Sequence, residues 1–188
     1  MLFPQMTAWP APAAPSSAQG KLILVEHKLV AANTTTVTFS GLNGDSDRAY
    51  FLKGVLVCPA FGAAQSLCWR PNGGAANLFE SGISLSAGVI SAIGATTVGR
   101  IAVTALAVAG EYQLECWIQA SKTENAVARR RTWRSFAVAS AGGTPAMYEM
   151  SGCWNETATN ITSIDLTHTV AANILNGSVF TLYKLAQT

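Results

Sequence analysis

The sequence has little charge and few of the residues that usually build active sites. Asp, Glu, Lys and Arg make up 12% of its 188 residues, about half the usual share, and there are two histidines. Such a surface must be largely small and uncharged. A monomer would have few charges to keep it in solution, so the composition favours an oligomer or an assembly component over a free enzyme.

Metal and cofactor motifs are also missing. Cys58, Cys68, Cys116 and Cys153 form no C-x-x-C pair, and a metal site would need closer spacing or more histidine. We therefore expect no cofactor and no metal. In a chain this long, the cysteines are expected to be reduced, mostly buried thiols.

No catalytic arrangement stands out either. His27 and His168 are far apart in the sequence, each on a predicted strand, and no G-x-S-x-G elbow is present. The loop at Asn43 to Asp47 lacks the full calcium-binding pattern and its distal Glu, so it is interpreted as a turn. A hydrolase would need paired carboxylates in one cleft, which the sequence cannot place. We expect the protein not to be an enzyme.

The patterns that are present indicate β structure. Alternating β-branched and aromatic residues, separated by turn signals and without an amphipathic helix, predict an all-β antiparallel sandwich or jelly roll over residues 21–188. The predicted strands are residues 22–29, 34–42, 48–58, 78–80, 83–90, 100–108, 112–120, 132–139, 147–154, 160–168 and 179–184.

The closing strand is expected to complete the fold. Asn176-Gly177 supplies a tight turn in front of Val179 to Lys184, and Asn160 to His168 alternates in the same way. The sequence predicts that these two segments form an antiparallel pair. Because the last strand is made last, it can take its place only when the rest of the chain is present.

Residues 1–20 predict an extended N-terminal arm. Four of the seven prolines lie there, which excludes a helix, and no Lys or Arg marks a signal peptide. The arm is either a disordered leader or a clamp on a neighbouring subunit. The second alternative is suggested by four side chains that are costly to expose to water: Leu2, Phe3, Met6 and Trp9.

Two further segments were considered as contact sites. The Gly- and Pro-rich stretch from Pro59 to Gly74, around Trp69 and Arg70, is expected to be a long excursion with specific contacts. Arg129, Arg130 and Arg131, followed by Trp133, suit an acidic partner, a phosphate or a solvated strand end. Four arginines in six positions do not make a basic face, so no nucleic-acid partner is expected.

Two other segments admit a second interpretation. The uncharged run from Ser81 to Gly99 is long enough for a membrane span, but its four glycines and few apolar residues favour β structure. Six aromatic residues could line a sugar-binding groove or fill the core, and core packing is the simpler interpretation. They are Tyr50, Trp69, Trp117, Trp133, Trp154 and Tyr183.

Three blocks of sequence resemble small β-rich virion structural proteins of tailed bacteriophages. Gly152 to Ile164 and Gly177 to Lys184 are similar to their C-terminal signature, a "tnItsI" strand followed by a "GS-x-x-x-LYK" strand. Leu42 to Tyr50 is similar to their "L-x-GD-x-D-x-x-Y" element. The resemblance implies a jelly-roll-like sandwich, no catalysis, and assembly on the particle as a homotrimer or similar oligomer.

We therefore expect a capsid decoration or cement protein on the virion surface, made in the host cytoplasm, whose partners are the major capsid protein and copies of itself. The alternative is a receptor-binding module of a tail fibre or baseplate that grips host glycans. Neither requires a membrane. The residues expected to bind a partner are Leu2, Phe3, Met6, Trp9, Trp69, Arg70, Arg129, Arg130, Arg131 and Trp133.

Overall fold

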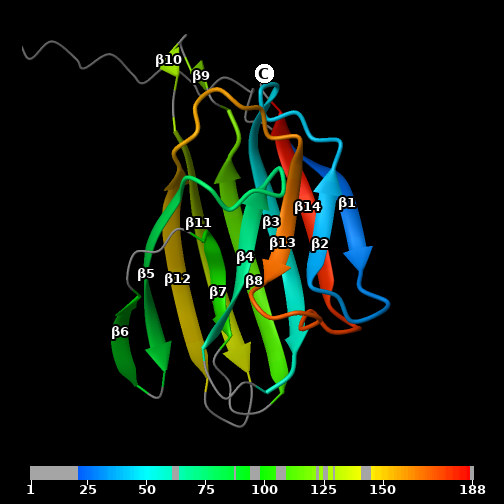
Figure 1. Ribbon diagram of the computed structural model, residues 1–188, viewed down its shortest axis with the longest axis vertical. Coiled ribbons are helices and arrows are strands. Elements are labelled where there is room, and N and C mark those ends of the chain that lie inside the picture. The colour runs from blue at the N-terminus through cyan, green and yellow to red at the C-terminus, as the bar shows by residue number, and fades with distance from the viewer. Residues whose placement is uncertain are drawn as a thin grey trace, which may run out of the picture.

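The computed structural model is all-β, as predicted. It describes residues 21–60, 64–86, 88–93, 98–104, 109–121, 123–124, 127–128, 130–140 and 145–186, and these ranges contain no helix. Two antiparallel sheets pack face to face as a β-sandwich (Figure 1). The proposed arm, residues 1–20, lies outside the described residues.

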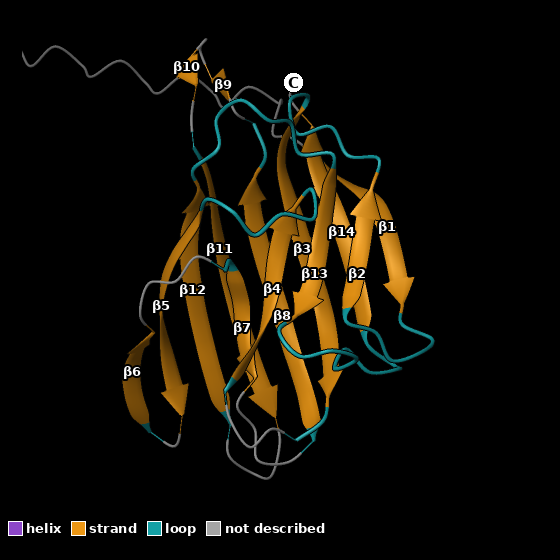
Figure 2. Ribbon diagram, in the orientation of Figure 1, coloured by secondary structure: helices purple, strands orange, loops and turns teal. Residues whose placement is uncertain are grey.

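The larger sheet has eight strands in the order β1-β14-β3-β8-β11-β12-β5-β6. Every neighbouring pair in it is antiparallel, and the sheet forms the rear layer in Figure 2. Its strands are β1 (Leu22–Leu29), β3 (Asp47–Cys58), β5 (Leu78–Ser86), β6 (Val89–Ile93), β8 (Gly110–Gln119), β11 (Arg131–Ser140), β12 (Ala146–Trp154) and β14 (Val179–Ala186).

The smaller sheet has four strands in the order β2-β13-β4-β7. They are β2 (Thr36–Ser40), β4 (Gln65–Pro71), β7 (Arg100–Thr104) and β13 (Ser163–His168). A separate short hairpin joins β9 (Thr123–Glu124) to β10 (Val127–Ala128).

The core lies between the two sheets. Alternate residues of each strand point inward, so Leu52 and Leu56 of β3 and Ile164 and Leu166 of β13 are fully buried. Trp69 of the smaller sheet meets Trp133 of the larger one edge to face, with ring centroids 6.4 Å apart. The two sheets therefore share one hydrophobic core.

The last two strands do not pair with each other, so this prediction was wrong. β13 lies between β2 and β4 in the smaller sheet, whereas β14 lies between β1 and β3 in the larger one. Residues 169–178 cross from one sheet to the other and turn at Gly177, whose φ is 91°. β14 has a partner strand on each side, so it does not lie at an edge of its sheet.

The stretch from Pro59 to Gly74 is also more regular than the sequence suggested. It contains β4, a central strand of the smaller sheet, and Trp69 is fully buried there. The low-charge run from Ser81 continues β5 and turns into β6 as a hairpin, as the preferred interpretation predicted. Among the described residues, no helix has the length and hydrophobicity that a membrane crossing requires.

Candidate functional site: the outer face of the larger sheet

The side of the larger sheet that points away from the smaller sheet is unusually apolar, and we call it the outer face. The described part of the chain has twelve exposed large hydrophobic side chains, and nine of them lie on this face. They are Leu22, Leu24, Leu29, Phe79, Ile83, Ile90, Trp117, Phe136 and Val138.

Strand pairing arranges the outer face in rows that run across the sheet. The Val55 row is Leu29, Val179, Val55, Gln113, Val138, Met147, Leu85 and Ile90. The Lys53 row is His27, Thr181, Lys53, Glu115, Phe136, Glu149, Ile83 and Ala92. The Phe51 row is Leu24, Tyr183, Phe51, Trp117, Arg134, Ser151 and Ser81.

A bulge in β1 decides which of its side chains join these rows. The pairing of β1 with β14 shifts between Leu24 and Glu26. As a result Leu22, Leu24, His27 and Leu29 share the outer face, although simple alternation predicted two different faces for them. The bulge therefore places Leu29 on the same surface as Leu22 and Leu24.

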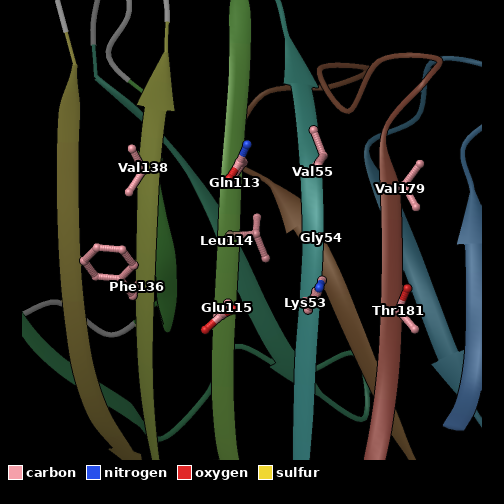
Figure 3. Close-up of a pocket in the computed structure, with 10 residues that line it drawn as sticks. All are labelled: Lys53, Gly54, Val55, Gln113, Leu114, Glu115, Phe136, Val138, Val179 and Thr181. Carbon is pink, nitrogen blue, oxygen red and sulfur yellow. The ribbon is translucent and has the colours of Figure 1, made fainter.

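A shallow hollow of about 510 Å³ lies at the middle of the outer face. Figure 3 shows its walls as two rows, from Val138 to Val179 and from Phe136 to Thr181. The Lys53 and Glu115 side chains stand directly opposite each other on β3 and β8. Its lining is mainly aliphatic and aromatic with one charge pair, which suits a protein surface better than a charged ligand.

Aromatic side chains gather beside the hollow. Phe51 stacks on Trp117 with ring centroids 4.5 Å apart, and Tyr183 lies on the other side of Phe51 at 6.2 Å. Trp117 remains 45% exposed. The cluster therefore presents aromatic surface to a partner at the centre of the sheet.

The opposite side of the sandwich has a different character. The outward side chains of β2 and β13 are hydroxyl or carboxyl groups, including Thr38, Ser40, Asp165 and Thr167. Thr36 and Thr167 hydrogen-bond across the two strands, with 3.2 Å between their hydroxyl oxygens. The outward side of β2 and β13 is thus polar, in contrast to the outer face of the larger sheet.

Three of the residues expected to bind a partner are inside the protein. Trp69 and Arg131 are fully buried and Trp133 is 3% exposed, so a partner cannot reach them in this structure. Arg70 is half-buried and Arg130 is exposed. The other five, Leu2, Phe3, Met6, Trp9 and Arg129, lie outside the described residues.

Arg131 was expected to bind a partner because the sequence could not show that its guanidinium binds groups of its own chain. It donates to the backbone carbonyls of Ala120, Glu156 and Thr159, and it lies 4.8 Å from the ring centroid of Trp154. Burial lowers its pKa, while Asp45 and Glu156 act in the opposite direction. Its place in this structure is to fasten the 155–160 loop to the end of the sandwich.

No metal site was expected among the titratable groups, and a plain turn was expected at Asn43 to Asp47. In the described part of the chain, no group of three or more His, Cys, Asp or Glu side chains could hold a metal ion. The Asn43 to Asp47 loop is a hydrogen-bonded turn, as predicted, and Asp47 accepts a hydrogen bond from the Tyr50 hydroxyl. Burial, together with that carboxylate, raises the pKa of Tyr50.

The four cysteines are free thiols, as expected, and three of them are buried. Burial raises the pKa of Cys58 to about 11 and that of Cys68 to about 12. Burial likewise raises the pKa of Cys116. Because the thiolate is the nucleophile, these three groups are poorly suited to covalent catalysis.

Comparisons with known proteins found no match. No protein-family model, no curated protein and no solved structure is similar enough to assign the chain to a family. The candidate site therefore depends on its own geometry.

Sequence reasoning considered Trp117 and Tyr183 for an aromatic groove but missed Phe51, Phe136 and the valines beside them. The sequence of β3 contained a signal for this surface. Phe51, Val55 and Val57 lie between the buried residues of the strand and therefore point to its other face, so β3 is largely apolar on both faces. A strand of an antiparallel sheet with one solvated face normally alternates with polar residues.

Proposed function

We propose that this protein is a non-enzymatic structural component of a phage particle. Within that class it is a decoration or cement protein that binds the outer shell and ties neighbouring capsid subunits together. The observation that carries the proposal is the outer face, because nine exposed large hydrophobic side chains on one surface favour a role in protein association. The low charge and the sequence resemblance point in the same direction.

In this role the sandwich is the rigid body and the arm from Leu2 to Pro15 reaches a neighbouring subunit. Burial of apolar area, at roughly 25 cal/mol per Å², supplies the adhesion. Exposed Arg130 is available to an acidic partner, whereas Arg131 is committed to the chain's own carbonyls.

A second candidate is a glycan-binding module of a tail fibre or baseplate. The specific observation in its favour is the Phe51, Trp117 and Tyr183 cluster, because exposed aromatic rings can stack on sugar rings. In this case Trp117→Ala would remove binding to host envelope while leaving any association with capsids unchanged.

The test is co-sedimentation of purified protein with empty capsids, tails or host cell envelope. Full-length protein is compared with a chain lacking residues 1–20 and with Val138→Lys, which places a charge on the outer face. The matched control is Thr38→Lys, which places the same charge on an exposed position of the smaller sheet. All variants are first checked for folding by circular dichroism.

We expect capsids to carry down the full-length protein and Thr38→Lys. Less of the truncated chain and of Val138→Lys should sediment with them. If only envelope or tails retain the full-length protein, the cement role is wrong and the glycan-binding role replaces it.

A further inference from the structure

The register of the outer face makes it complementary to itself. We propose that a second copy of the chain covers this face, related to the first by a two-fold axis that runs along the strands between β3 and β8. Rotation about that line turns the face over and keeps every residue at its height along the strand. It sets β3 against β8 of the second copy, β14 against β11, and β1 against β12.

The charges of the outer face match under this rotation. Lys53 and Glu115 are direct partners in the register, so each Lys53 faces the other copy's Glu115, and this happens twice. His27 and Glu149 lie in the Lys53 row, each on the third strand from the axis, so the imidazole of one copy faces the carboxylate of the other and can donate a hydrogen bond to it. Opposite charges at matched positions favour this register.

The remaining charged groups of the described outer face meet no like charge. Arg134 forms a 2.6 Å ion pair with Glu149 of its own chain. Under the rotation it faces the second copy's Tyr183, where the guanidinium would lie over the aromatic ring. Glu111 faces the second copy's Val57. The rotation therefore brings no two charges of the same sign together.

The apolar side chains and the shape of the face agree with the same axis. The hollow spans β14, β3, β8 and β11, so the boundary between β3 and β8 runs through its middle (Figure 3). Phe136 of each copy faces the small Thr181 of the other, which lies on the opposite side of the hollow. Val138 faces Val179, and Phe51 faces Trp117.

The area is sufficient for a stable dimer. Six strands at a spacing of about 4.8 Å give one side of the footprint. The three named rows and a fourth row through Ala49 and Gln119, each two residues or about 6.8 Å from the next, give the other side, and the product is roughly 800 Å² per copy. This is about the size of a standard specific interface. Aligned sheets pack at about −30°, so the central residues stay in contact although the corners separate.

Other arrangements fit less well. A two-fold axis that crosses the strands at the height of Lys53 would place Lys53 against Lys53 and Glu115 against Glu115. An axis moved by one strand, between β8 and β11, would pair Lys53 with Glu149 but would set the Glu115 carboxylate against the apolar Phe136 ring, so only one of the two charges of the hollow would meet an opposite charge. An isologous contact closes as a dimer, and it therefore differs from the trimer that the sequence resemblance implies.

This inference names a partner for the surface on which the proposed function rests. The purified protein tests it without any capsid, so failure of one leaves the other standing. The full chain is studied by sedimentation equilibrium, with Lys53→Glu and Glu115→Lys measured separately and as an equimolar mixture. The Lys53→Glu chain has glutamate at both positions 53 and 115, and the Glu115→Lys chain has lysine at both. Each variant alone would therefore bring like charges together in a dimer, whereas a dimer of one chain of each kind would again place opposite charges face to face.

We expect the wild type to be a dimer and each variant alone to need about tenfold or more higher concentration to associate. The mixture should return to near the wild-type midpoint, and an affinity tag on one variant should retain the other. Arg48→Glu is the control, because it changes the net charge equally at an exposed position outside these rows. Circular dichroism and thermal unfolding show that each variant is folded.

The proposal is overturned if the wild type is a monomer or a trimer, or if neither single variant weakens its association. It is also overturned if the mixture associates no better than its components. A mixture of Lys53→Glu with Glu149→Lys provides a further test. Rescue by Glu149→Lys in place of Glu115→Lys would mean that the axis lies between β8 and β11, and the proposed register would be wrong.

Discussion

At the scale of single residues, Arg131 shows how a charged side chain can act as part of the core. Its guanidinium is fully buried and is surrounded by three carbonyl oxygens and the Trp154 ring. The buried charge is tolerated there because several hydrogen bonds replace its water, and Asp45 and Glu156 favour its charged form.

Arg131→Ala should therefore destabilise the protein by about 2–4 kcal/mol, because it leaves buried carbonyls without donors and creates a cavity. Urea unfolding measures the change. Arg130→Ala, one residue earlier and exposed, should change the free energy of unfolding by less than about 0.5 kcal/mol. Equal effects of the two substitutions would contradict the assigned role of Arg131.

His168 should make the fold sensitive to mild acid. Its Nε2 lies 3.1 Å from the Thr104 hydroxyl, and burial lowers its pKa below the usual value, partly opposed by the Val170 backbone. Since the unfolded chain then binds a proton at a higher pH than the folded chain, stability is complete above about pH 6.5 and falls as the pH drops below it.

The measurement is the urea midpoint at about pH 7.5 and about pH 5.5, a window in which most carboxylates stay ionised. His168→Gln should reduce the loss of stability between the two values, even if it lowers stability at both. The exposed His27→Gln is the control and should keep the wild-type difference. An unchanged difference in His168→Gln would show that other groups cause the acid sensitivity.

At the scale of secondary-structure elements, β14 joins the two ends of the chain. It pairs with β1 on one side and β3 on the other, and its alternate residues serve two purposes. Phe180 and Leu182 are fully buried in the core, while Thr181 and Tyr183 belong to the outer face. The same strand therefore contributes both to the core and to the outer face that we propose binds a partner.

The two faces of β14 can be separated by mutation. Phe180→Ala should cost about 3–5 kcal/mol of unfolding free energy, because it leaves a cavity between the sheets. Tyr183→Ala should cost about 1 kcal/mol or less of the monomer's stability, because its ring lies on the surface against Phe51. Measurements at protein concentrations low enough to exclude association compare the two. A larger loss for Tyr183→Ala would contradict the assignment of faces.

At the scale of the whole molecule, the two broad surfaces of the sandwich differ in polarity. The smaller sheet presents hydroxyl and carboxyl groups, whereas the larger sheet presents rows of valine, leucine and aromatic side chains. This asymmetry is typical of a sheet whose second face is covered in an assembly.

Covering of the outer face should be visible in the fluorescence of Trp117, which is 45% exposed in the single chain. Its emission is obtained as the difference between wild type and Trp117→Phe. We expect this emission to move to shorter wavelength as the protein concentration rises from low to high micromolar, because association removes water from the indole. Val138→Lys should suppress the change, and an emission maximum independent of concentration would speak against association through this face.

The class of fold and most of the strands could be predicted from the amino-acid sequence alone. Period-2 alternation with turn residues between strands depends only on neighbours along the chain, so residues such as Ile164, Leu166, Phe180 and Leu182 could be assigned to the core in advance. The turn at Gly177 was predictable for the same reason. The low charge likewise indicated a surface made to be buried.

The pairing of the strands, and the apolar surface that this pairing leaves exposed, could not be predicted and are seen only in the folded chain. Pairing between strands far apart in sequence has no local signal, so β13 and β14 could not be assigned to different sheets from their similar patterns. The bulge in β1 and the register of β3 with β8 bring distant residues such as Lys53 and Glu115 side by side. Arg131 is the converse case, since its carbonyl partners become neighbours only when the chain has folded.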